Sequence, residues 1–545
     1  MSIIVNLSDS WKCMAEDKAV QLLGYIHDIE EQQRALVSVE NIDAWIATLK
    51  NLIGFFALVK KGKNTVFAAV DHIRSRPLFY AVNEQTFYLS DSAEWVRQQM
   101  NETVMDEYAK AEFQLTGYVT GKNTLYKSVK QLQAGECLVY TENKLVVKRY
   151  YSFEHREPEQ YKESALLDEL DIVAKASIQR MISYANGRQI VIPLSGGYDS
   201  RLIATLLKEA NYDNIITFTY GIKGNKEAAY SKIVADNLGL KWYFIEYTED
   251  LWKTAWQTEE RKRYQRESSN WCSLAHMQDW LAVKIMKEQS IIENNAIFVP
   301  GHSGDMVAGS HIPNFIQTNL TVRYKKDILV EHLLHKHYCL ARLSEFKILV
   351  SVFKEEIESS LALQATYSAQ EFANECERYN WQNRQAKYIV NSVNVYGFFD
   401  YDWWIPLWDR NFIEFFENLP LVLRNHSWYT SYVKLKFNDN VKSPEYIELG
   451  SAGVSKVSGV ITSMASSVLL EKIKLKYLLR FIYRLVIKPL INKKDGLLIN
   501  SAHDCKERQQ LERQDYLMNG VTAYFFLKEF DFTSQHDRSA VAKNG

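Results

Sequence analysis

The stretch Val191-Ile-Pro-Leu-Ser-Gly-Gly-Tyr-Asp-Ser200 decides the fold of this chain. A short apolar run ends in a Ser-Gly-Gly turn, and a helix-like pattern begins at Ser200. A strand, a glycine loop and a helix N-terminus in this order bind phosphate through backbone N–H groups and the positive end of the helix dipole. Gly196 and Gly197 carry no Cβ, so the main chain can approach an anion closely. We therefore expect a phosphate-binding loop after this strand.

The polar side chains of the loop fit the same interpretation. Ser195 and Ser200 offer hydroxyl donors, and Asp199 offers a carboxylate for Mg²⁺. The loop is not a Walker A motif, because no G-K-[ST] follows the glycines. It resembles the S-G-G-x-D-S loop of the ATP-pyrophosphatase (PP-loop) enzymes. This resemblance implies binding of the β,γ-pyrophosphate of ATP and transfer of AMP to a substrate oxygen. A structural Gly-Gly turn before a helix is the alternative.

The surrounding sequence alternates between strand and helix patterns. A helical pattern over 162–186 leads into the strand at 190, and a second strand is expected at 215–220. A helix over 226–238 and a strand over 241–245 follow. Such alternation predicts a doubly wound parallel sheet. Beyond residue 311 the pattern is mainly helical.

The N-terminal part has a different pattern, with short strands separated by polar turns. Strands are expected at 3–5, 20–23, 54–59, 65–70, 77–80, 86–89 and 136–140, and helices near 41–50 and 92–100. The charged, proline-containing segment 152–160 marks a domain boundary. We expect an N-terminal domain over 1–155, an ATP-binding domain over 160–450 and a helical C-terminal extension over 451–545.

Bulk composition bounds the function classes. The 545 residues are 47% hydrophobic and 24% charged, which is typical of a soluble chain of several domains. The net charge of −1 argues against a general electrostatic affinity for nucleic acid. The six cysteines include no C-x-x-C pair, as expected of reduced thiols. Without a signal-like start or a run of about 18 apolar residues, we expect a cytoplasmic protein.

A second loop, Phe298-Val-Pro-Gly-His-Ser-Gly-Asp-Met306, also follows a strand pattern. In a doubly wound sheet it can return to the same edge and face the first loop. Asp305 would then complement Asp199 as a ligand for Mg²⁺. A nucleophile elbow around Ser303 is rejected, because Asp305 stands where that motif needs its second glycine.

Together these segments resemble the asparagine synthetase family over roughly residues 20–440. The matching stretches are Gly54-Phe-Phe-Ala57 for G-x-F-A, Val70 to Tyr80 for D-R-x-G-x-x-P-L-Y-Y, Leu89 to Glu94 for A-S-E, 298–309 for S-G-E-G-x-D-E-x-x-x-G, and Pro406-Leu-Trp-Asp409 for P-F-L-D. The resemblance implies an α/β protein with an Ntn-hydrolase-like α+β sandwich of glutamine amidotransferase type before the PP-loop domain. The G-H-S-G-D loop and the aromatic run Tyr401 to Asp409 resemble most closely the asparagine-synthase-type proteins of bacterial surface-polysaccharide synthesis. Taken alone, that aromatic run fits a core corner equally well.

The N-terminal domain departs from the family at its glutaminase site. The family needs a cysteine directly after the initiator Met as nucleophile. Here Ser2 holds that place, and Cys13 is the first cysteine. The family's N-G-E-I-Y-N appears as Leu23-Gly-Tyr-Ile-His-Asp28, so the oxyanion-holding asparagine is gone. We expect no glutaminase activity, and Ser2 as an N-terminal nucleophile is the alternative.

The synthetase part also departs from the family pattern. His302 stands where the family has Glu, and either accepts a proton from the attacking amine or is a spacer. Met306 replaces the acid after Asp305, and these changes put aspartate as substrate in doubt.

The resemblance also implies roles for residues outside the two loops. Leu194, Tyr220 and Gly301 would line the adenosine site through their backbones. Lys456 would stabilise the adenylation transition state, or would be a solvated loop lysine.

The resemblance implies an ATP-dependent, AMP-forming carbon–nitrogen ligase that uses ATP and Mg²⁺. A small-molecule carboxylate would form an acyl-adenylate and release pyrophosphate, and ammonia or an amine would then attack to give an amide. The acid is an aspartate, a sugar uronate or a peptide side chain. In β-lactam synthetases and lasso-peptide cyclases the amine belongs to the substrate itself. A catalytically inactive binding or scaffold protein is the alternative from another class.

Three further groups of residues allow more than one interpretation. His332, His335, His337 and Cys339 do not share one helical face, which argues against a metal site. Arg384, Lys387 and Asn391 follow helical spacing and either cap the core edge or contact an acidic substrate. The pattern of residues 468–494 predicts a basic amphipathic helix. This helix either lies on the anionic inner face of a membrane or packs on the synthetase domain.

Overall fold

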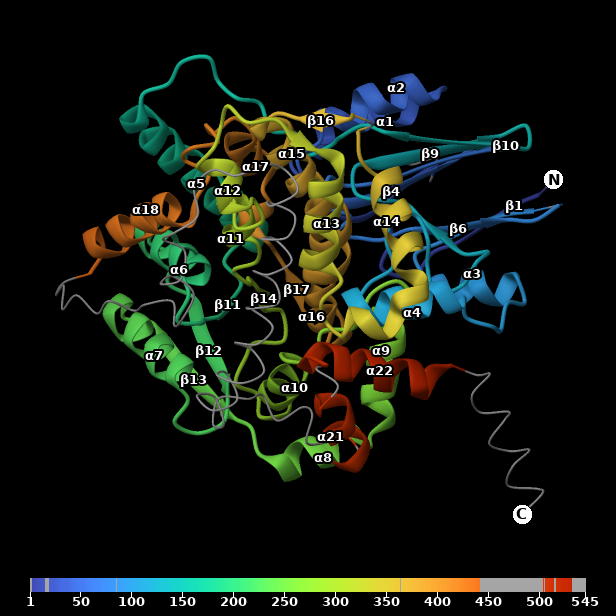
Figure 1. Cartoon of the computed structure of the whole chain (residues 1–545). Coiled ribbons are helices and arrows are strands. Elements are labelled where there is room, and N and C mark those ends of the chain that lie inside the picture. The colour runs from blue at the N-terminus through green and yellow to red at the C-terminus, as the bar shows by residue number, and fades with distance from the viewer. Residues whose placement is uncertain are drawn as a thin grey trace.

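The computed structural model of this chain describes residues 2–14, 19–84, 86–362, 364–441, 503, 505–513 and 516–531. Two sheet-based halves lie side by side, and a largely helical layer covers them (Figure 1). The fold class agrees with the expectation from sequence: an α+β sandwich is followed by an α/β domain with a parallel sheet.

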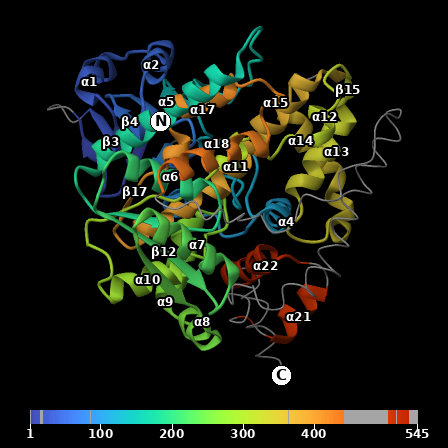
Figure 2. The same ribbon diagram turned by 90° about the vertical axis from the view of Figure 1, so that its left-hand side faces the viewer.

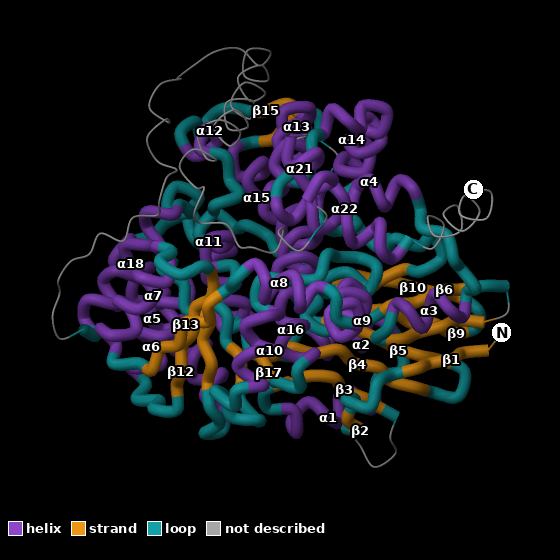
Figure 3. The backbone as a smooth tube through the Cα atoms, turned by 90° about the horizontal axis from the view of Figure 1, so that it is seen from below, coloured by secondary structure: helices purple, strands orange, loops and turns teal. Residues whose placement is uncertain are grey.

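The N-terminal half is a sandwich of two sheets, whose strands lie on the right in Figure 3. The six-stranded antiparallel sheet has the order β10-β9-β5-β4-β3-β2, and the four-stranded sheet has the order β1-β7-β6-β8. Their bounds are β1 Ser2–Asn6, β2 Lys12–Cys13, β3 Val20–Ile26, β4 Gly54–Lys61, β5 Thr65–Val70, β6 Phe79–Val82, β7 Thr86–Ser90, β8 Lys130–Gln131, β9 Glu136–Thr141 and β10 Lys144–Arg149. The helices of this half are α1 Ile29–Ser38, α2 Ile42–Leu49, α3 Ala93–Gln99 and α4 Glu107–Thr116.

Strand β4 explains why the sandwich has two cores. Its residues are almost all buried, because successive side chains point to opposite faces and both faces are covered. Ala57 and Val59 pack against the second sheet, near Phe87. Phe56 and Leu58 pack on the other side, in the cluster that includes Trp45 of α2.

The second half is built on the parallel sheet β13-β12-β11-β14-β17. Its strands are β11 Ile190–Pro193, β12 Ile215–Gly221, β13 Lys241–Glu246, β14 Ile297–Phe298 and β17 Asp402–Trp403. The chain moves outward from β11 to β13 through α6 (Asp199–Glu209) and α7 (Lys226–Leu238). It then returns to β14 on the other side of β11, so the strand order reverses between these two strands. Ligands of doubly wound sheets bind at such a reversal, outside the carboxyl ends of the strands.

Helices fill the remainder of the described chain. They are α5 Glu163–Ala185, α8 Glu249–Trp256, α9 Glu259–Ser269, α10 Trp280–Glu288, α11 Gly304–Val307, α12 Asn314–Gln317, α13 Lys326–His337, α14 Val350–Ser359, α15 Ala369–Tyr379, α16 Asn394–Phe398, α17 Arg410–Glu417, α18 His426–Asp439, α21 Cys505–Arg513 and α22 Met518–Phe530. Short turns of other types are η1 Leu343–Leu349, the π-helix η2 Asn380–Ile389, η3 Val390–Val393 and η4 Pro406–Trp408, and β15 Tyr324–Lys325 pairs with β16 Thr366–Tyr367. No helix of the described residues is both long and apolar enough to cross a membrane.

The turn after β5 docks the N-terminal half onto the half that contains the parallel sheet. Buried Asp71 shapes this turn by accepting the N–H groups of Phe56 and Ile73 at 2.8 and 2.9 Å. His72 then donates from Nε2 to the Trp408 carbonyl at 2.7 Å, and its own carbonyl accepts the indole N–H of Trp381 at 2.9 Å. The stretch that resembles D-R-x-G-x-x-P-L-Y-Y therefore lies at the domain interface.

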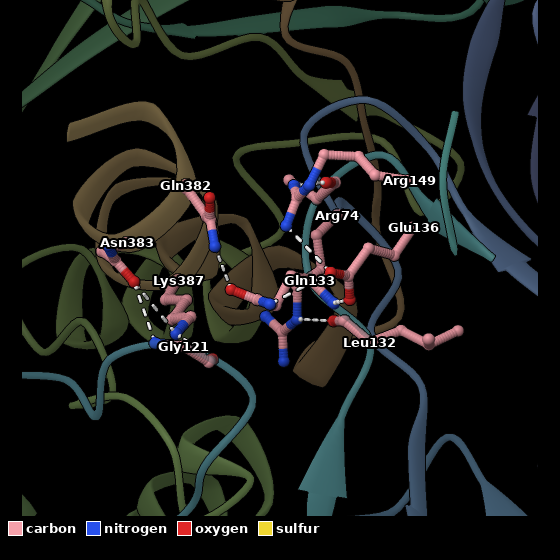
Figure 4. A network of polar contacts seen from close by, with 10 residues as sticks. Arg74, Gly121, Leu132, Gln133, Glu136, Arg149, Gln382, Asn383 and Lys387 are labelled. Carbon is pink, nitrogen blue, oxygen red and sulfur yellow. Dashed lines mark hydrogen bonds and ion pairs between the residues drawn. The ribbon is translucent and has the colours of Figure 1, made fainter. Parts of the chain in front are cut away.

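Polar contacts from η2 strengthen this interface (Figure 4). The buried Lys387 amino group donates to the carbonyls of Val119 and Gly121 at 2.8 and 2.6 Å. Asn383 accepts the Gly121 N–H at 3.0 Å, and Gln382 donates to the Gln133 side chain. Lys387, one of the three residues expected to cap the core edge or to contact an acidic substrate, therefore stabilises the domain interface.

The C-terminal helix α22 returns to the N-terminal half and lies beside α4 (Figures 1 and 2). The rings of Phe526 and Phe113 stack with their centroids 5.4 Å apart. Trp271 packs against the same helix, with its ring centroid 6.1 Å from that of Phe526. Helices α21 and α22 fall in the region expected to be a C-terminal extension, whose predicted start at 451 lies outside the described residues.

Several local predictions need correction. Helices α1 and α4 and strand β10 were not expected from the sequence pattern. The strand expected at 77–80 begins at Phe79, because Pro77 has no N–H to give to a ladder. The aromatic run 401–409 is core: β17 pairs with β14, and Trp403, Trp404 and Trp408 are buried.

Candidate active site

The first loop lies at the carboxyl end of β11 and leads into α6. Hydrogen bonds within the loop fix its shape: the Ser195 N–H donates to Ser200 Oγ at 3.2 Å, and the Gly197 N–H donates to Ser195 Oγ at 3.1 Å. Arg201 holds it from the helix side by donating to the Gly196 carbonyl at 3.0 Å. No side chain of the described residues caps the start of α6. The N–H groups of its first turn therefore remain available to an anion.

The second loop approaches the first through two glycines. A Cβ on Gly301 would lie 2.5 Å from the Ser200 nitrogen, and a Cβ on Gly304 would lie 2.4 Å from Asp199 Oδ1. Only residues without a side chain allow this approach. As a result, the Asp305 N–H donates to Asp199 Oδ2 at 3.3 Å. The structure thus places the two predicted metal ligands side by side.

The two carboxylates have unequal environments. Burial, followed by the neighbouring charge of Asp305, raises the pKa of Asp199 to about 7. Asp305 is exposed and accepts the Ser310 hydroxyl at 3.3 Å. Two adjacent carboxylates that repel each other are the donor set that a hard divalent cation favours. The residues therefore fit Mg²⁺.

His302 occupies the second loop with a defined tautomer. The Ser392 hydroxyl donates its single proton to the Ile389 carbonyl at 2.6 Å. The contact of 3.1 Å between His302 Nε2 and Ser392 Oγ must therefore be donated by the imidazole. Its Nδ1 then carries the lone pair, and it is buried without a partner among the described residues. Burial, followed by the charge of His276, lowers the pKa of His302 to about 4.

The residues expected to line the adenosine site have other contacts. The Leu194 N–H donates to the Phe218 carbonyl at 2.9 Å, and its carbonyl accepts the Thr219 hydroxyl at 2.5 Å. The Tyr220 hydroxyl donates to Asp279. Gly301, as described above, brings the two loops together. An adenosine contact through Leu194 would therefore use the second lone pair of its carbonyl.

Asp279 is a site-adjacent residue that sequence reasoning missed. It accepts the Tyr396 hydroxyl at 2.8 Å and contacts His276 Nε2 at 3.2 Å, besides the bond from Tyr220. Burial acts to raise its pKa, but the charge of His276 and these hydrogen bonds hold the pKa of Asp279 at about 2. No local motif surrounds it. Its partners Tyr220 and Tyr396 lie far away in sequence, and only the fold brings them to Asp279 and the nearby His276.

The N-terminal residues considered for a glutaminase site lie on three different strands. Ser2 lies exposed on β1, where its hydroxyl contacts Thr86 Oγ1 at 2.9 Å. Leu23 lies in β3 of the other sheet, opposite Ala57. Cys13 is exposed on the short strand β2.

Several other predictions fall outside this site or outside the described residues. Among the described residues no group of three or more His, Cys, Asp or Glu side chains could hold a metal ion. The histidines of α13 have separate surroundings, since His332 packs near Phe372 and His335 pairs with Glu331. Lys456 and residues 468–494 lie outside the described residues.

Solved structures show only distant similarity. Thirty-five chains match, among them an NH₃-dependent NAD synthetase from Campylobacter jejuni in complex with the nitrate ion, at 17% identity and a TM-score of 0.20. That match covers 28% of this chain and 62% of the synthetase. Glutamine phosphoribosylpyrophosphate amidotransferase from B. subtilis matches at 9% identity, with 50% and 55% of the two chains covered and a TM-score of 0.17. The chain thus spans less than two thirds of these proteins, and no curated protein matches it.

Two family models match the chain itself. The model described as "Glutamine amidotransferase domain" matches residues 39–151, and the model described as "Asparagine synthase" matches residues 180–433. The first covers most of the two-sheet sandwich. The second covers the parallel sheet with both loops. With these two domains in this order, the chain belongs to the asparagine synthetase family.

Proposed function

We propose that this protein is an ATP-dependent ligase that adenylates a small-molecule carboxylate and then forms an amide. The observation that carries the proposal is the pair of loops at the strand-order reversal, where Asp199 and Asp305 lie side by side below an uncapped helix N-terminus. The asparagine synthase domain supports the same reaction class.

In the first step the substrate carboxylate attacks the α-phosphorus of ATP and pyrophosphate leaves. The backbone N–H groups of Gly196 and Gly197 and the hydroxyls of Ser195 and Ser200 would hold the leaving pyrophosphate. Mg²⁺ bound to Asp199 and Asp305 would supply positive charge to the triphosphate. Rotation of the Ser195 hydroxyl, which now accepts the Gly197 N–H, would turn it toward the anion.

In the second step ammonia or an amine attacks the acyl carbon and AMP leaves. The attacking nitrogen must lose a proton. His302 offers a neutral imidazole with an unprotonated Nδ1, which is the state that a general base requires. Burial keeps this imidazole neutral, and Ser392 holds its orientation.

The nitrogen source is ammonia or an amine rather than glutamine. Ser2 replaces the cysteine nucleophile, and Leu23 replaces the asparagine that would hold the oxyanion. Glutamate release from glutamine should not exceed background. Hydrolysis of glutamine by the wild type that disappears in Ser2→Ala would contradict the proposal that glutamine is not the nitrogen source.

The substrate is an acid other than aspartate, and a sugar uronate of surface-polysaccharide synthesis is our candidate. The replacement of the family Glu by His302 and of the following acid by Met306 supports a changed acid. The G-H-S-G-D resemblance supports the polysaccharide setting.

Isotope exchange between pyrophosphate and ATP tests the proposal with a panel of acids that includes aspartate and glucuronate. We expect exchange that depends on one acid, and its loss in Asp199→Asn. Removal of a buried carboxylate should leave that variant folded, with a thermal midpoint at least equal to that of the wild type. Exchange at the wild-type rate in Asp199→Asn would contradict the assignment. Absence of exchange with every acid would instead favour an inactive scaffold protein.

A further inference from the structure

Arg384 is a half-buried cation that lacks an acidic partner. It lies on η2, and no carboxylate of the described residues forms an ion pair with its guanidinium. Its Cζ atom lies 6.0 Å from the centroid of the Tyr388 ring. A guanidinium that is partly removed from water without a counter-charge is unfavourable. Its planar fork matches a carboxylate or a phosphate, so an anionic ligand would relieve the cost.

Two buried histidines lie near Arg384. The imidazoles of His311 and His337 stack with centroids 6.1 Å apart and are both buried. Burial lowers the pKa of both histidines well below the ordinary value, and the next strongest causes are the cations Lys336 and Arg384. His311 Nδ1 is buried and has no partner among the described residues. The cluster Arg384, Lys336, His311 and His337 therefore combines two cations with two neutral imidazoles, and its cations can accept an anion.

This cluster borders the loop that carries Asp305. Gln385, the neighbour of Arg384, accepts the Ser303 hydroxyl at 2.6 Å. Lys336 donates to the Ser310 carbonyl at 3.4 Å, and the Ser310 hydroxyl donates to Asp305. The cluster is thus connected by direct contacts to the second loop.

The interface contacts of η2 fix where Arg384 lies. Asn383 and Lys387 are bound to the 119–121 segment of the N-terminal half (Figure 4). Gln385 is bound to Ser303 on the synthetase side. Helical geometry places position 384 between these two anchored faces. Bonds on either side therefore position Arg384, which itself forms no hydrogen bond or ion pair with a described residue.

We propose that Arg384, supported by Lys336 and His311, binds a second anionic group of the acid substrate, a carboxylate or a phosphate. The inference rests on the proposed function and narrows its substrate class to acids that carry a negative group besides the carboxylate that is adenylated. Phosphorylated uronates and dicarboxylates belong to this class.

The first experiment measures anion binding directly and needs no turnover. Inorganic phosphate is titrated calorimetrically into the full chain saturated with Mg²⁺ and the non-cleavable analogue α,β-methylene-ATP, so that the first loop is already filled. We expect Arg384→Gln to weaken phosphate binding about 10- to 100-fold, because a charge-assisted bidentate contact is lost. The phosphate affinity of Arg384→Lys should lie between those of Arg384→Gln and the wild type. Arg34→Gln, a substitution of an exposed residue on α1, should bind phosphate like the wild type. Unchanged affinity of α,β-methylene-ATP shows that the variants are folded. Equal phosphate affinity in Arg384→Gln and the wild type would overturn the subsite.

The second experiment distinguishes a substrate group from free phosphate. Pyrophosphate exchange is compared for matched acids, succinate against succinamate and glucuronate 1-phosphate against glucuronate. We expect the added anionic group to lower KM about 10-fold or more in the wild type, and Arg384→Gln to remove that preference. If phosphate binding falls but the preference remains, the site binds free phosphate and the substrate assignment is wrong. If no acid supports exchange, the proposed function fails, while the calorimetry still decides the subsite.

Discussion

At the scale of single residues, sequence reasoning succeeded where a motif is contiguous. The loop 194–200 carries its glycines, hydroxyls and carboxylate within seven positions, so a local pattern sufficed to locate it. Asp279 escaped, since its role depends on partners such as Tyr220 and Tyr396 that lie far away along the chain. Arg384 was already a candidate for contact with an acidic substrate, but the sequence did not show that it is half-buried without an acidic partner among the described residues. Isolated charged residues without a motif carry no signal of burial or of a missing counter-charge.

His302 gives a prediction at this scale. If its Nδ1 accepts the proton of the attacking amine, His302→Ala should slow amide formation by about 10²- to 10⁴-fold. Adenylate formation, measured by pyrophosphate exchange, should change by less than about threefold, because the base acts only in the second step. Rapid-quench measurement of both half-reactions checks this.

Ser392→Ala serves as a matched variant for His302. It removes the acceptor that fixes the Nε2–H tautomer and leaves the imidazole in place. We expect a smaller loss, again confined to the amide step. An equal loss in both half-reactions for His302→Ala would make His302 a structural residue.

At the scale of elements, the alternating pattern predicted the parallel sheet, since β11 and β12 are buried apolar runs that alternate with helices. The short strand β17 could not be predicted. It has only two residues, and its pairing with Ile297 and Phe298, which lie about a hundred residues earlier in the chain, is not visible in a local pattern. Helix α1 has a polar composition with few apolar positions, so its pattern was not distinguishable from a loop.

The contact between the second loop and α6 gives a prediction at this scale. Gly301→Ala should push the loop away from the first turn of α6, because the new Cβ would lie 2.5 Å from the Ser200 nitrogen. We expect pyrophosphate exchange to fall at least 10-fold and the free energy of unfolding to drop by about 1–3 kcal/mol. Chemical denaturation and exchange assays on the same preparation measure both effects.

Gly397→Ala is the control for this substitution. Gly397 lies in α16, and a Cβ there would meet no heavy atom within 4 Å. Alanine in a helix should be neutral or slightly stabilising. If both variants behave alike, close packing of the second loop on α6 is not required for activity.

At the scale of the whole molecule, the docking of the two halves was beyond sequence reasoning. The turn 71–76, helix η2 and helix α22 come from three separate parts of the chain. Each has only a weak local pattern, and their contacts exist only after both sheets have formed. The bonds from His72 to Trp408 and from Lys387 to Val119 are therefore visible only in the folded structure.

Lys387 links this interface to pH. Burial, followed by the charge of Arg74, lowers the pKa of Lys387 to about 7 from the ordinary 10.5, while the surrounding Cys272, Glu112 and Glu136 act in the opposite direction. Between pH 7 and 10.5 the unfolded chain binds a proton that the folded chain has released. Stability from this group therefore rises with pH across that window, by roughly 1.4 kcal/mol for each pH unit.

Lys387→Met removes both the titration and the bonds to the carbonyls of Val119 and Gly121. At pH 9 we expect the variant to be less stable than the wild type by about 2–4 kcal/mol, because two buried carbonyls lose their donor. The difference should shrink as the pH falls toward 7, since the wild type loses stability when its unfolded chain binds a proton at position 387, whereas the variant has no such titration. Urea denaturation at several pH values measures this difference in the free energy of unfolding.

Lys253→Met on α8 is the control and should show no such trend, because Lys253 and its partner Glu249 are both exposed. A difference between wild type and Lys387→Met that stays constant from pH 7 to 9.5 would show that Lys387 remains charged in the interface, held as an ammonium by its two carbonyl acceptors.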